Sequence, residues 1–292
     1  MDERGHAAST ESGIEAAYFL TERETTEMEG QKDKGTGGQR DRETRKSNLL
    51  VPLSPCPPVP LSPCLSISLS ELREKRRLVK YITQNLEAAY GVPVNVSPYD
   101  PLSELILTIL SQSTTDINSR RAFENLKQRF PDWESARRAR ASSIAAAIKS
   151  GGLANAKSMV IKNALNEIKK RRGSLDLSFL HTSPIEEARE FLTSLTGVGP
   201  KTAACVLLFA CNRKIFPMDV HILRITRRIG LVHERFSDEQ SHKRMEKLVP
   251  PNKHYSLHVN LIRHGRQICR PQNPKCDKCP LVEQCDYGQS QL

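Results

Sequence analysis

The sequence predicts an all-α fold, and three observations lead to this prediction. From Ser70 onward, apolar residues recur at intervals of three and four, as on the buried face of a helix. Segments with this period begin at Ser, Thr, Asp or Pro and end near Gly, which are common helix start and stop residues. No segment shows a sustained alternation of apolar and polar residues, the pattern of a half-buried strand. We expect about nine or ten helices.

The first 70 residues differ from the rest of the chain and are expected to lie outside this helical fold. Residues 1–50 are rich in Glu, Thr, Gly, Lys and Arg and have no sustained apolar period, so they are predicted to form a disordered tail. The hexapeptide VPLSPC follows twice, at Val51–Cys56 and Val59–Cys64, and its dense prolines indicate an extended linker.

The predicted helices then follow one another. Their first two apolar faces contain Leu78, Val79, Ile82, Leu86, Ala89 and Tyr90, and then Leu102, Leu105, Ile106, Ile109 and Leu110. A later helix begins near Ser142 and ends at Gly151-Gly152. Ser183 and Glu186 form a predicted capping box for a helix over residues 184–195.

Positive charge is concentrated behind the first 70 residues. The whole chain has a formal net charge of +11, while residues 1–70 hold 8 Lys and Arg against 11 Asp and Glu, which leaves +14 for residues 71–292. Such an excess predicts attraction to a polyanion, most often a nucleic acid. Charge alone leaves DNA, RNA and an anionic membrane surface open.

A membrane-spanning or exported protein is not expected. The longest apolar run, Ala203–Cys211, has nine residues, whereas a membrane-spanning helix needs about 20. The start of the sequence lacks the basic and apolar regions of a signal peptide. Eight cysteines without an export signal fit reduced thiols or metal ligands. We therefore expect a soluble protein.

The segment Gly197-Val198-Gly199 joins two predicted helices and is a candidate phosphate site. Two glycines allow a tight reversal and expose amide groups at the N-terminus of the second helix, which runs over about residues 201–210. The alternative is an ordinary turn between helices. Lys201 follows directly, where the helix dipole is predicted to lower its pKa and favour a nucleophilic amine. A point-charge contact to phosphate is the other role open to Lys201.

Asp219 is a predicted N-cap of a helix that continues through Arg224, Arg227 and Arg228. Helix capping alone explains an aspartate at such a position. However, Lys201 and Asp219 stand at the starts of two helices that flank one apolar helix. They can therefore face a common cleft, which is the pairing that nucleophilic catalysis by an amine requires.

Four cysteines near the C-terminus form a candidate metal centre. Their pattern is Cys269-x6-Cys276-x2-Cys279-x5-Cys285, and four cysteines within 17 residues can surround one centre. The spacing favours a [4Fe–4S] cluster, because four-cysteine zinc sites usually contain two C-x2-C pairs. Zinc remains the alternative.

Two further polar segments are candidates for contacts to nucleic acid. Arg270 and Lys275 lie between the first two of these cysteines, so this loop is basic and can touch a phosphate backbone. The run from Leu110 to Asp116 separates two helices. Capping explains its last two residues, whereas Gln112 and Ser113 need another reason.

These motifs, in this order, resemble endonuclease III, a base-excision-repair DNA glycosylase and AP lyase of the helix–hairpin–helix glycosylase superfamily. The resemblance spans about residues 75–288 and depends on LTGVGPKTA, MDVHILR and the sequence His264-Gly265-Arg266 before the cysteines. It implies a helical barrel domain at residues 97–213 and a cluster-bearing helical domain formed by residues 71–96 and 214–288. The chain before these domains, residues 1–70, holds the tail and the linker.

The resemblance also implies the activity and the partners. Oxidised pyrimidines would be removed from damaged double-stranded DNA, with Lys201 as the nucleophile at C1′ and Asp219 as the assisting carboxylate. The strand would then be cut by β-elimination on the 3′ side. We expect a [4Fe–4S] cofactor, no membrane partner, a monomer, and a cytoplasmic protein that associates with the bacterial nucleoid through DNA.

Some positions depart from the family pattern. Thr196 replaces a proline, and Val220 replaces a threonine. The family's glutamine that fills the space of the flipped base aligns with Ser113, while Gln112 stands one residue earlier, about 100° around a helix. Which of the two fills this space stays open, whereas Leu153 matches the family's apolar wedge.

Two other functions are open from the sequence. A monofunctional mismatch glycosylase of the same superfamily would lack the lysine after Gly-Val-Gly and would have a glutamate in the early motif. A non-catalytic DNA-binding or redox-sensing iron–sulfur protein would keep only the hairpin and the cluster. Lys201 and the lack of a glutamate at Gln112-Ser113 argue against the first, and the presence of Lys201 together with Asp219 argues against the second.

Overall fold

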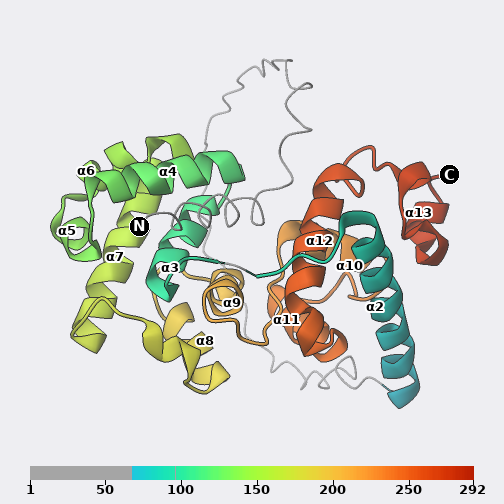
Figure 1. Cartoon of the computed structure of the whole chain (residues 1–292). Helices are drawn as coiled ribbons and strands as arrows, with labels where there is room; N and C mark the ends of the chain where they lie inside the picture. Colours follow the sequence, from blue (N-terminus) through green and yellow to red (C-terminus); the bar gives the residue numbers. More distant parts are fainter. Residues whose placement is uncertain (1–67, 96) are drawn as a thin grey trace, which may run out of the picture.

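The computed structural model describes residues 68–95 and 97–292, and all regular structure in these ranges is helical (Figure 1). The described residues contain no β-strand, so the predicted all-α class is confirmed. Nor do they include a helix with the length and apolar character needed to cross a membrane. The predicted disordered tail and the proline-rich linker lie outside the described residues.

The described ranges contain twelve α-helices, more than the nine or ten that the sequence predicted. In chain order they are α2 (Leu69–Tyr90), α3 (Pro101–Ser111), α4 (Asp116–Arg129), α5 (Trp133–Arg138), α6 (Ala141–Ala147), α7 (Ala154–Arg172), α8 (Ile185–Thr193), α9 (Pro200–Phe209), α10 (Val220–Arg228), α11 (Asp238–Leu248), α12 (His254–Gln267) and α13 (Asp286–Gln289). Three of these, α5, α6 and α13, have seven residues or fewer, too few for an apolar period to be recognised.

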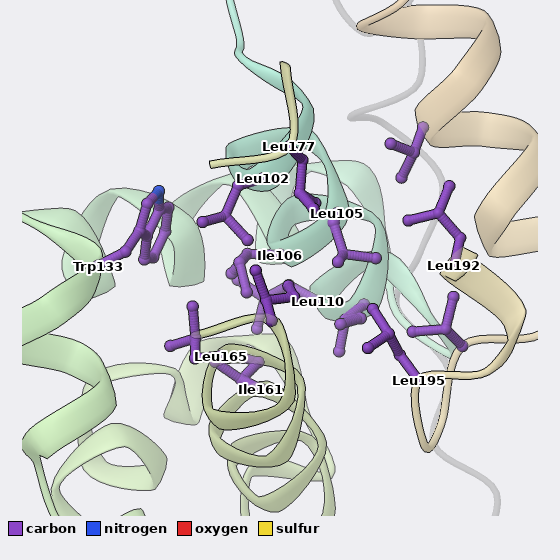
Figure 2. Packing of buried hydrophobic residues seen from close by; sticks show 14 of the residues in the cluster. Leu102, Leu105, Ile106, Leu110, Trp133, Ile161, Leu165, Leu177, Leu192 and Leu195 are labelled. Atoms are coloured by element: carbon purple, nitrogen blue, oxygen red, sulfur yellow. The ribbon is translucent and has the colours of Figure 1, made fainter. Parts of the chain in front are cut away.

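Helices α3 to α9 surround one hydrophobic core. Leu105, Ile106 and Leu110 of α3 lie in this core, with Ile161 and Leu165 of α7 close to them (Figure 2). Burying each of these side chains stabilises the fold by about 1.5–3 kcal/mol. Nearly every residue of α3 is buried, because this helix runs through the middle of the group instead of along its surface.

A second core lies between α2, α10, α11 and α12, which Figure 1 shows beside the first group of helices. The chain enters the first group after α2 and returns between Ile215 and Phe216, whose side chains belong to the first and the second core respectively. Helix α9 contacts both groups, since Phe209 packs edge-on against Tyr255 and His258 of α12. The C-terminal end of α9 is therefore held against the second group of helices.

The helix starts show where local rules hold and where they fail. Asp100 accepts hydrogen bonds from the first amides of α3, as expected for an acidic N-cap. The predicted capping box at Ser183 is wrong. Pro184 is the N-cap of α8, no side chain caps this helix, and Ser183 Oγ is buried without a partner. Arg213 donates instead to the Ser183 carbonyl at 2.8 Å, a contact from a distant part of the chain.

Candidate active site

The loop between α8 and α9 presents free helix-end amides. Gly197 has φ of 84°, and a Cβ atom there would lie 2.7 Å from both methyl groups of Val160 on α7, so only glycine fits. Val198 is buried and anchors the loop in the first core. Gly199 is the N-cap of α9, and no side chain caps this helix. The first amides of α9 are therefore available to an anion such as a phosphate.

Lys201 lies in the first turn of α9, and its pKa is raised above the ordinary value. The largest cause is the interaction with Cys205, one turn along the same helix; desolvation opposes it, and the carboxylates of Asp219 and Asp116 add to it. The predicted lowering of this pKa by the helix dipole is therefore wrong. Burial raises the pKa of Cys205 to about 11. With a pKa above its ordinary value, Lys201 of the free protein is an ammonium ion at neutral pH.

Asp219 is the N-cap of α10, as predicted, and its Oδ1 accepts a hydrogen bond of 2.8 Å from the Ile222 amide. Its charge acts on Lys201, so the two helix starts bring an amine and a carboxylate into electrostatic range. His258 is buried within electrostatic range of both, with Nδ1 3.0 Å from the Pro217 carbonyl oxygen. Burial lowers the pKa of His258 to about 4, so this ring is neutral at physiological pH.

Gln112 and Ser113 lie just after α3 and have different environments. The Gln112 side chain donates from Nε2 to Thr202 Oγ1 at 3.3 Å, which places it beside Lys201 on α9. Ser113 is exposed and has a positive φ of 53°. Thr115 then caps α4 by accepting from the Asn118 amide, as the sequence predicted for this position.

Leu153 lies on a second loop, between a short 3-10 helix (Lys149–Gly151) and α7. Its side chain is 63% exposed although it is apolar. It also has a positive φ of 47°, a strained conformation for a branched residue, directly after Gly152 with φ of 68°. An exposed apolar side chain on a strained backbone is a feature that packing of the free protein does not explain.

The sequence His264-Gly265-Arg266 joins the two groups of helices around this site. His264 Nδ1 lies 3.0 Å from the Tyr90 hydroxyl of α2. A Cβ atom at Gly265 would lie 2.8 Å from that of His221, so glycine lets α12 approach the start of α10. Arg266 forms a two-point ion pair with Asp116 at the start of α4, with Nη2 3.0 Å from Oδ1. Asp116 thus connects α12 to the surroundings of Lys201.

The four cysteines after α12 lie against the second core and have hydrogen-bond donors near their sulfur atoms. Arg228 Nη1 donates to Cys269 Sγ at 3.3 Å, and the Gly288 amide donates to Cys285 Sγ at 3.3 Å. Cys276 is buried, and Cys279 is half-buried. Across the described ranges, no three His, Cys, Asp or Glu side chains converge closely enough to hold a single metal ion. The sulfur atoms therefore share one region of the fold without meeting at a point.

Arg270 and Lys275 are exposed on the loop between Cys269 and Cys276. The loop backbone is held by Arg228, whose Nη1 and Nη2 donate to the carbonyls of Arg270 at 2.7 Å and Pro271 at 3.0 Å. Figure 1 shows this loop between α12 and α13, in the outer part of the second group of helices and well away from α9. The structure thus brings Lys201, Asp219 and Gln112 together and leaves Arg270 and Lys275 outside that group.

Comparison with known proteins decides the family. The model of the HhH-GPD superfamily of base excision DNA repair proteins matches residues 106–251, which include Lys201 and Asp219 and end before the four cysteines. Endonuclease III of Sulfolobus acidocaldarius is 32% identical over 185 residues, which cover 63% of this chain and 80% of that protein. The chain belongs to the HhH-GPD superfamily. The segment from α8 through Gly197-Val198-Gly199 to α9 is its helix–hairpin–helix.

Other members of the HhH-GPD superfamily show the same relationship. Endonuclease III of Thermotoga maritima is 29% identical over 195 residues, which cover 67% of this chain and 87% of that protein. A protein of Arabidopsis thaliana, named provisionally as a DNA glycosylase, is 37% identical over 191 residues, and the chain covers only 65% of its length. This chain is thus related to endonuclease III within a superfamily of DNA glycosylases.

Solved structures of the HhH-GPD superfamily confirm the fold. A non-covalent endonuclease III–DNA complex superposes with a TM-score of 0.65 at 22% identity and covers 74% of this chain and 97% of that chain. A thermostable thymine-DNA glycosylase superposes with a TM-score of 0.62 at 24% identity and covers 75% and 98%. The chain therefore has the two-part helical architecture that the resemblance implied.

Glu104 of α3 is a site residue that the sequence prediction missed. It is only 3% exposed, and burial raises its pKa to about 7. Ser97 Oγ and Thr108 Oγ1 each donate to it at 3.4 Å, and Lys201 acts on it electrostatically. The available signal was a single acidic residue within an otherwise apolar helix. A buried carboxylate is thus added to the charges around the candidate nucleophile of this HhH-GPD protein.

Proposed function

We propose that this protein is a DNA glycosylase with AP lyase activity that removes oxidised pyrimidines from duplex DNA. The observation that carries this proposal is the pairing of the Lys201 amine with the Asp219 carboxylate at two neighbouring helix starts. The family membership supports the glycosylase class. A relative of Arabidopsis thaliana named DNA glycosylase/AP lyase ROS1, 28% identical over 173 residues, supports the lyase step, although the chain covers only 12% of that protein.

The proposed reaction begins when the damaged nucleotide leaves the base stack, at an unstacking cost of a few kcal/mol. The Lys201 amine attacks C1′, the bond from C1′ to the base breaks, and the base departs with the electron pair and takes up a proton. The bond between C1′ and the ring oxygen O4′ then breaks, O4′ takes up a proton, and the nitrogen forms the double bond of a Schiff base. This Schiff base acidifies the hydrogen on C2′. Loss of this proton breaks the bond between C3′ and its oxygen and cuts the strand on the 3′ side.

Asp219 has a proton-handling or charge-stabilising role in this proposal. Lys201 is an ammonium ion in the free protein, so it must lose a proton before it can attack. Asp219 acts on it electrostatically and is held in place by its hydrogen bond to the Ile222 amide. Its carboxylate can accept that proton or stabilise the positive charge that develops on the sugar.

Borohydride trapping on DNA tests this function directly. Reduction of a Schiff base makes a stable covalent bond between the protein and DNA that contains an abasic site. We expect a cross-linked species with the wild-type protein and a strand cut on damaged duplex without borohydride. Base release without any cross-link or strand cut would favour the monofunctional alternative, and binding without either would favour the non-catalytic one.

We also propose that Cys269, Cys276, Cys279 and Cys285 hold a [4Fe–4S] cluster. Their donor set fits this cofactor, because N–H groups near the sulfur atoms of Cys269 and Cys285 stabilise thiolate ligands. The spacing of the four cysteines favours this cluster, because four-cysteine zinc sites usually contain two C-x2-C pairs and only Cys276 and Cys279 form such a pair here. When bound, the cluster would supply a covalent crosslink of the C-terminal segment to the second core.

The cluster proposal predicts a brown protein. Preparations made without oxygen should contain about four irons and show the broad visible absorption of this cluster. Changing Cys276 to Ser should lower the iron content, whereas the same change at Cys211, which is buried in the first core, should leave it unaltered. A colourless protein that contains about one zinc and no iron would replace the cluster with a zinc site.

The exposed groups around the site form the proposed DNA-binding surface. Amides of the Gly197–Gly199 loop would hold one phosphate, and Arg270 and Lys275 would hold others farther along the duplex. Leu153 would act as the wedge, because it is apolar, exposed and held on a strained backbone. Gln112 has the longer side chain to fill the space of the flipped base, and it already lies beside α9.

Salt dependence tests the two basic residues separately from the chemistry. The double variant Arg270→Ala, Lys275→Ala should weaken binding to damaged and undamaged duplex alike. Its plot of log affinity against log salt should be flatter by up to about two units, at roughly 0.9 per lost phosphate contact. Single-turnover cleavage at saturating protein should hardly change.

A charge-matched control shows whether a change in the salt slope is specific to the loop that holds Arg270 and Lys275. The variant Lys170→Ala, Lys243→Ala removes two exposed lysines from α7 and α11 and should leave the salt slope nearly unaltered. An unchanged slope in the Arg270 and Lys275 variant, together with a collapsed single-turnover rate, would show that this loop supports the active site or the cluster instead.

A further inference from the structure

Lys157 is a buried lysine without an acidic partner. Its side chain lies on α7 and is only 4% exposed, and desolvation lowers its pKa. Its ammonium group donates two hydrogen bonds of 2.7 Å, one to the Leu110 carbonyl and one to the Gly151 carbonyl. In the part of the chain that the structure describes, no carboxylate forms an ion pair with it. A buried cation that binds only backbone carbonyls needs a structural reason.

The two carbonyls stand directly before the two loops assigned to DNA. Leu110 is in the last turn of α3, just before Gln112 and Ser113, and Gly151 ends the short helix just before Leu153. The last carbonyls of a helix have no partner within the helix and carry partial negative charge, so an ammonium group suits both ends. One Lys157 side chain therefore donates hydrogen bonds to carbonyls at the C-terminal ends of two separate helical segments.

Gly151, at the start of the second loop, lies tightly against α4 and in ordinary contact with the end of α3. A Cβ atom at Gly151 would lie 3.0 Å from the Ala122 side chain on α4 and 3.9 Å from the Leu110 carbonyl oxygen. Each loop contains a non-glycine residue with a positive φ, which is 53° at Ser113 and 47° at Leu153. Such strained conformations persist only where the surrounding contacts impose them. The Lys157 ammonium group is hydrogen-bonded to the residues that precede both loops, Leu110 and Gly151.

We propose that Lys157 is a positioning residue that locks the Gln112–Ser113 loop and the Gly152–Leu153 loop into one rigid unit, which enters the duplex as a whole when a base is extruded. This inference rests on the proposed function. A wedge and a space-filling residue on independent loops would each have to be ordered at the moment of base flipping. A unit that is already ordered in the free protein does not lose this conformational entropy when it binds DNA. Lys157 itself contacts no reacting atom and should affect extrusion more than the chemistry at Lys201.

The test compares Lys157→Met with a matched variant on the same helix. Lys162 of α7 also donates to two backbone carbonyls, but these belong to Arg137 in the last turn of α5 and to Ala139 directly after it. Lys162→Met therefore removes the same kind of contact away from the two loops. Base flipping is followed by the fluorescence of 2-aminopurine beside a damaged base, and single-turnover rates are measured for base excision from paired duplex and for cutting at a preformed abasic site.

We expect Lys157→Met to slow flipping and excision by about 10- to 100-fold per folded molecule, the size of effect that a small misplacement causes. Cutting at the abasic site should stay within about twofold, because no base has to be extruded there. Lys162→Met should retain both rates. Equal losses in excision and abasic-site cutting by Lys157→Met, or equal behaviour of the two variants, would overturn the proposal.

Hydrogen exchange of the free protein separates this inference from the proposed function. In Lys157→Met, the amides of residues 111–114 and those of residues 152–154 should both exchange faster than in the wild type. In Lys162→Met, the exchange rates of both sets should equal those of the wild type. This readout does not depend on any enzymatic activity, so it holds even for a protein that cuts no DNA. If Lys157→Met does not fold, Lys157→Gln supports the same comparison, since it keeps a hydrogen-bond donor and removes the charge. Faster exchange in only one loop would show that the loops are not coupled.

Discussion

Replacing Lys201 with alanine should abolish both base excision and strand cutting while DNA binding is retained. A methyl group cannot form an imine, so the covalent pathway is lost and single-turnover rates should fall by about three orders of magnitude or more. Lys201 lies in the uncapped first turn of α9, where its removal leaves the glycine loop and its amides unaltered. The measurement is borohydride cross-linking to abasic-site DNA, together with affinity for the same DNA.

An exposed lysine provides the control for this variant. Lys214 follows the other end of α9, and Lys214→Ala should cross-link as the wild type does. Cross-linking of Lys201→Ala at the wild-type level would assign the nucleophile to another amine. A loss of folding in this variant, seen as a lower melting temperature, would have to be separated from chemistry by measuring rates per folded molecule.

Replacing Asp219 with asparagine should separate its two roles, because the amide keeps the helix cap and loses the charge. Asn and Asp are about equally good N-caps, so the free energy of unfolding should change by less than about 0.5 kcal/mol. The single-turnover rate should fall by about 100-fold or more, as for the loss of a proton-transferring group. The pKa of Lys201 should also fall, since Asp219 is one of the charges that raise it.

The matched control is a capping aspartate elsewhere in the fold. Asp132 caps α5 and accepts from the Ser135 amide at 2.7 Å, so Asp132→Asn makes the same chemical change away from Lys201. It should alter neither rate nor stability appreciably. If Asp219→Asn lowered the melting temperature sharply and left the rate per folded molecule intact, Asp219 would be a cap and nothing more.

The pKa of Lys201 has a consequence for when the nucleophile becomes active. Besides Cys205 on its own helix, the groups that raise it are Asp219 on α10 and Asp116 on α4, and Asp116 is itself bound by Arg266 of α12. An ammonium group suits the approach to phosphate, whereas attack on C1′ requires the neutral amine. Loss of the proton therefore has to accompany binding of the substrate in the proposed reaction, and Asp219 is the carboxylate placed to receive it.

The sequence by itself determined the helical class, the turn at Gly197 and the cap at Asp219. These features depend on residues within about four positions of one another, so local rules of period, capping and backbone freedom are sufficient. The same rules failed at Ser183, the predicted capping residue, because its carbonyl accepts a hydrogen bond from Arg213 of a distant segment.

Only the tertiary structure decided the electrostatics and the contacts between loops. The pKa of Lys201 rises through Cys205, one turn along the same helix, and further through Asp219 and Asp116 on two other helices, so the helix dipole considered in the sequence does not prevail. Glu104 is buried because α3 runs through the centre of its core. Lys157 joins two loops whose carbonyls are far apart along the chain. Each of these properties depends on which helices lie side by side, and apolar periodicity along one segment carries no information about its neighbours.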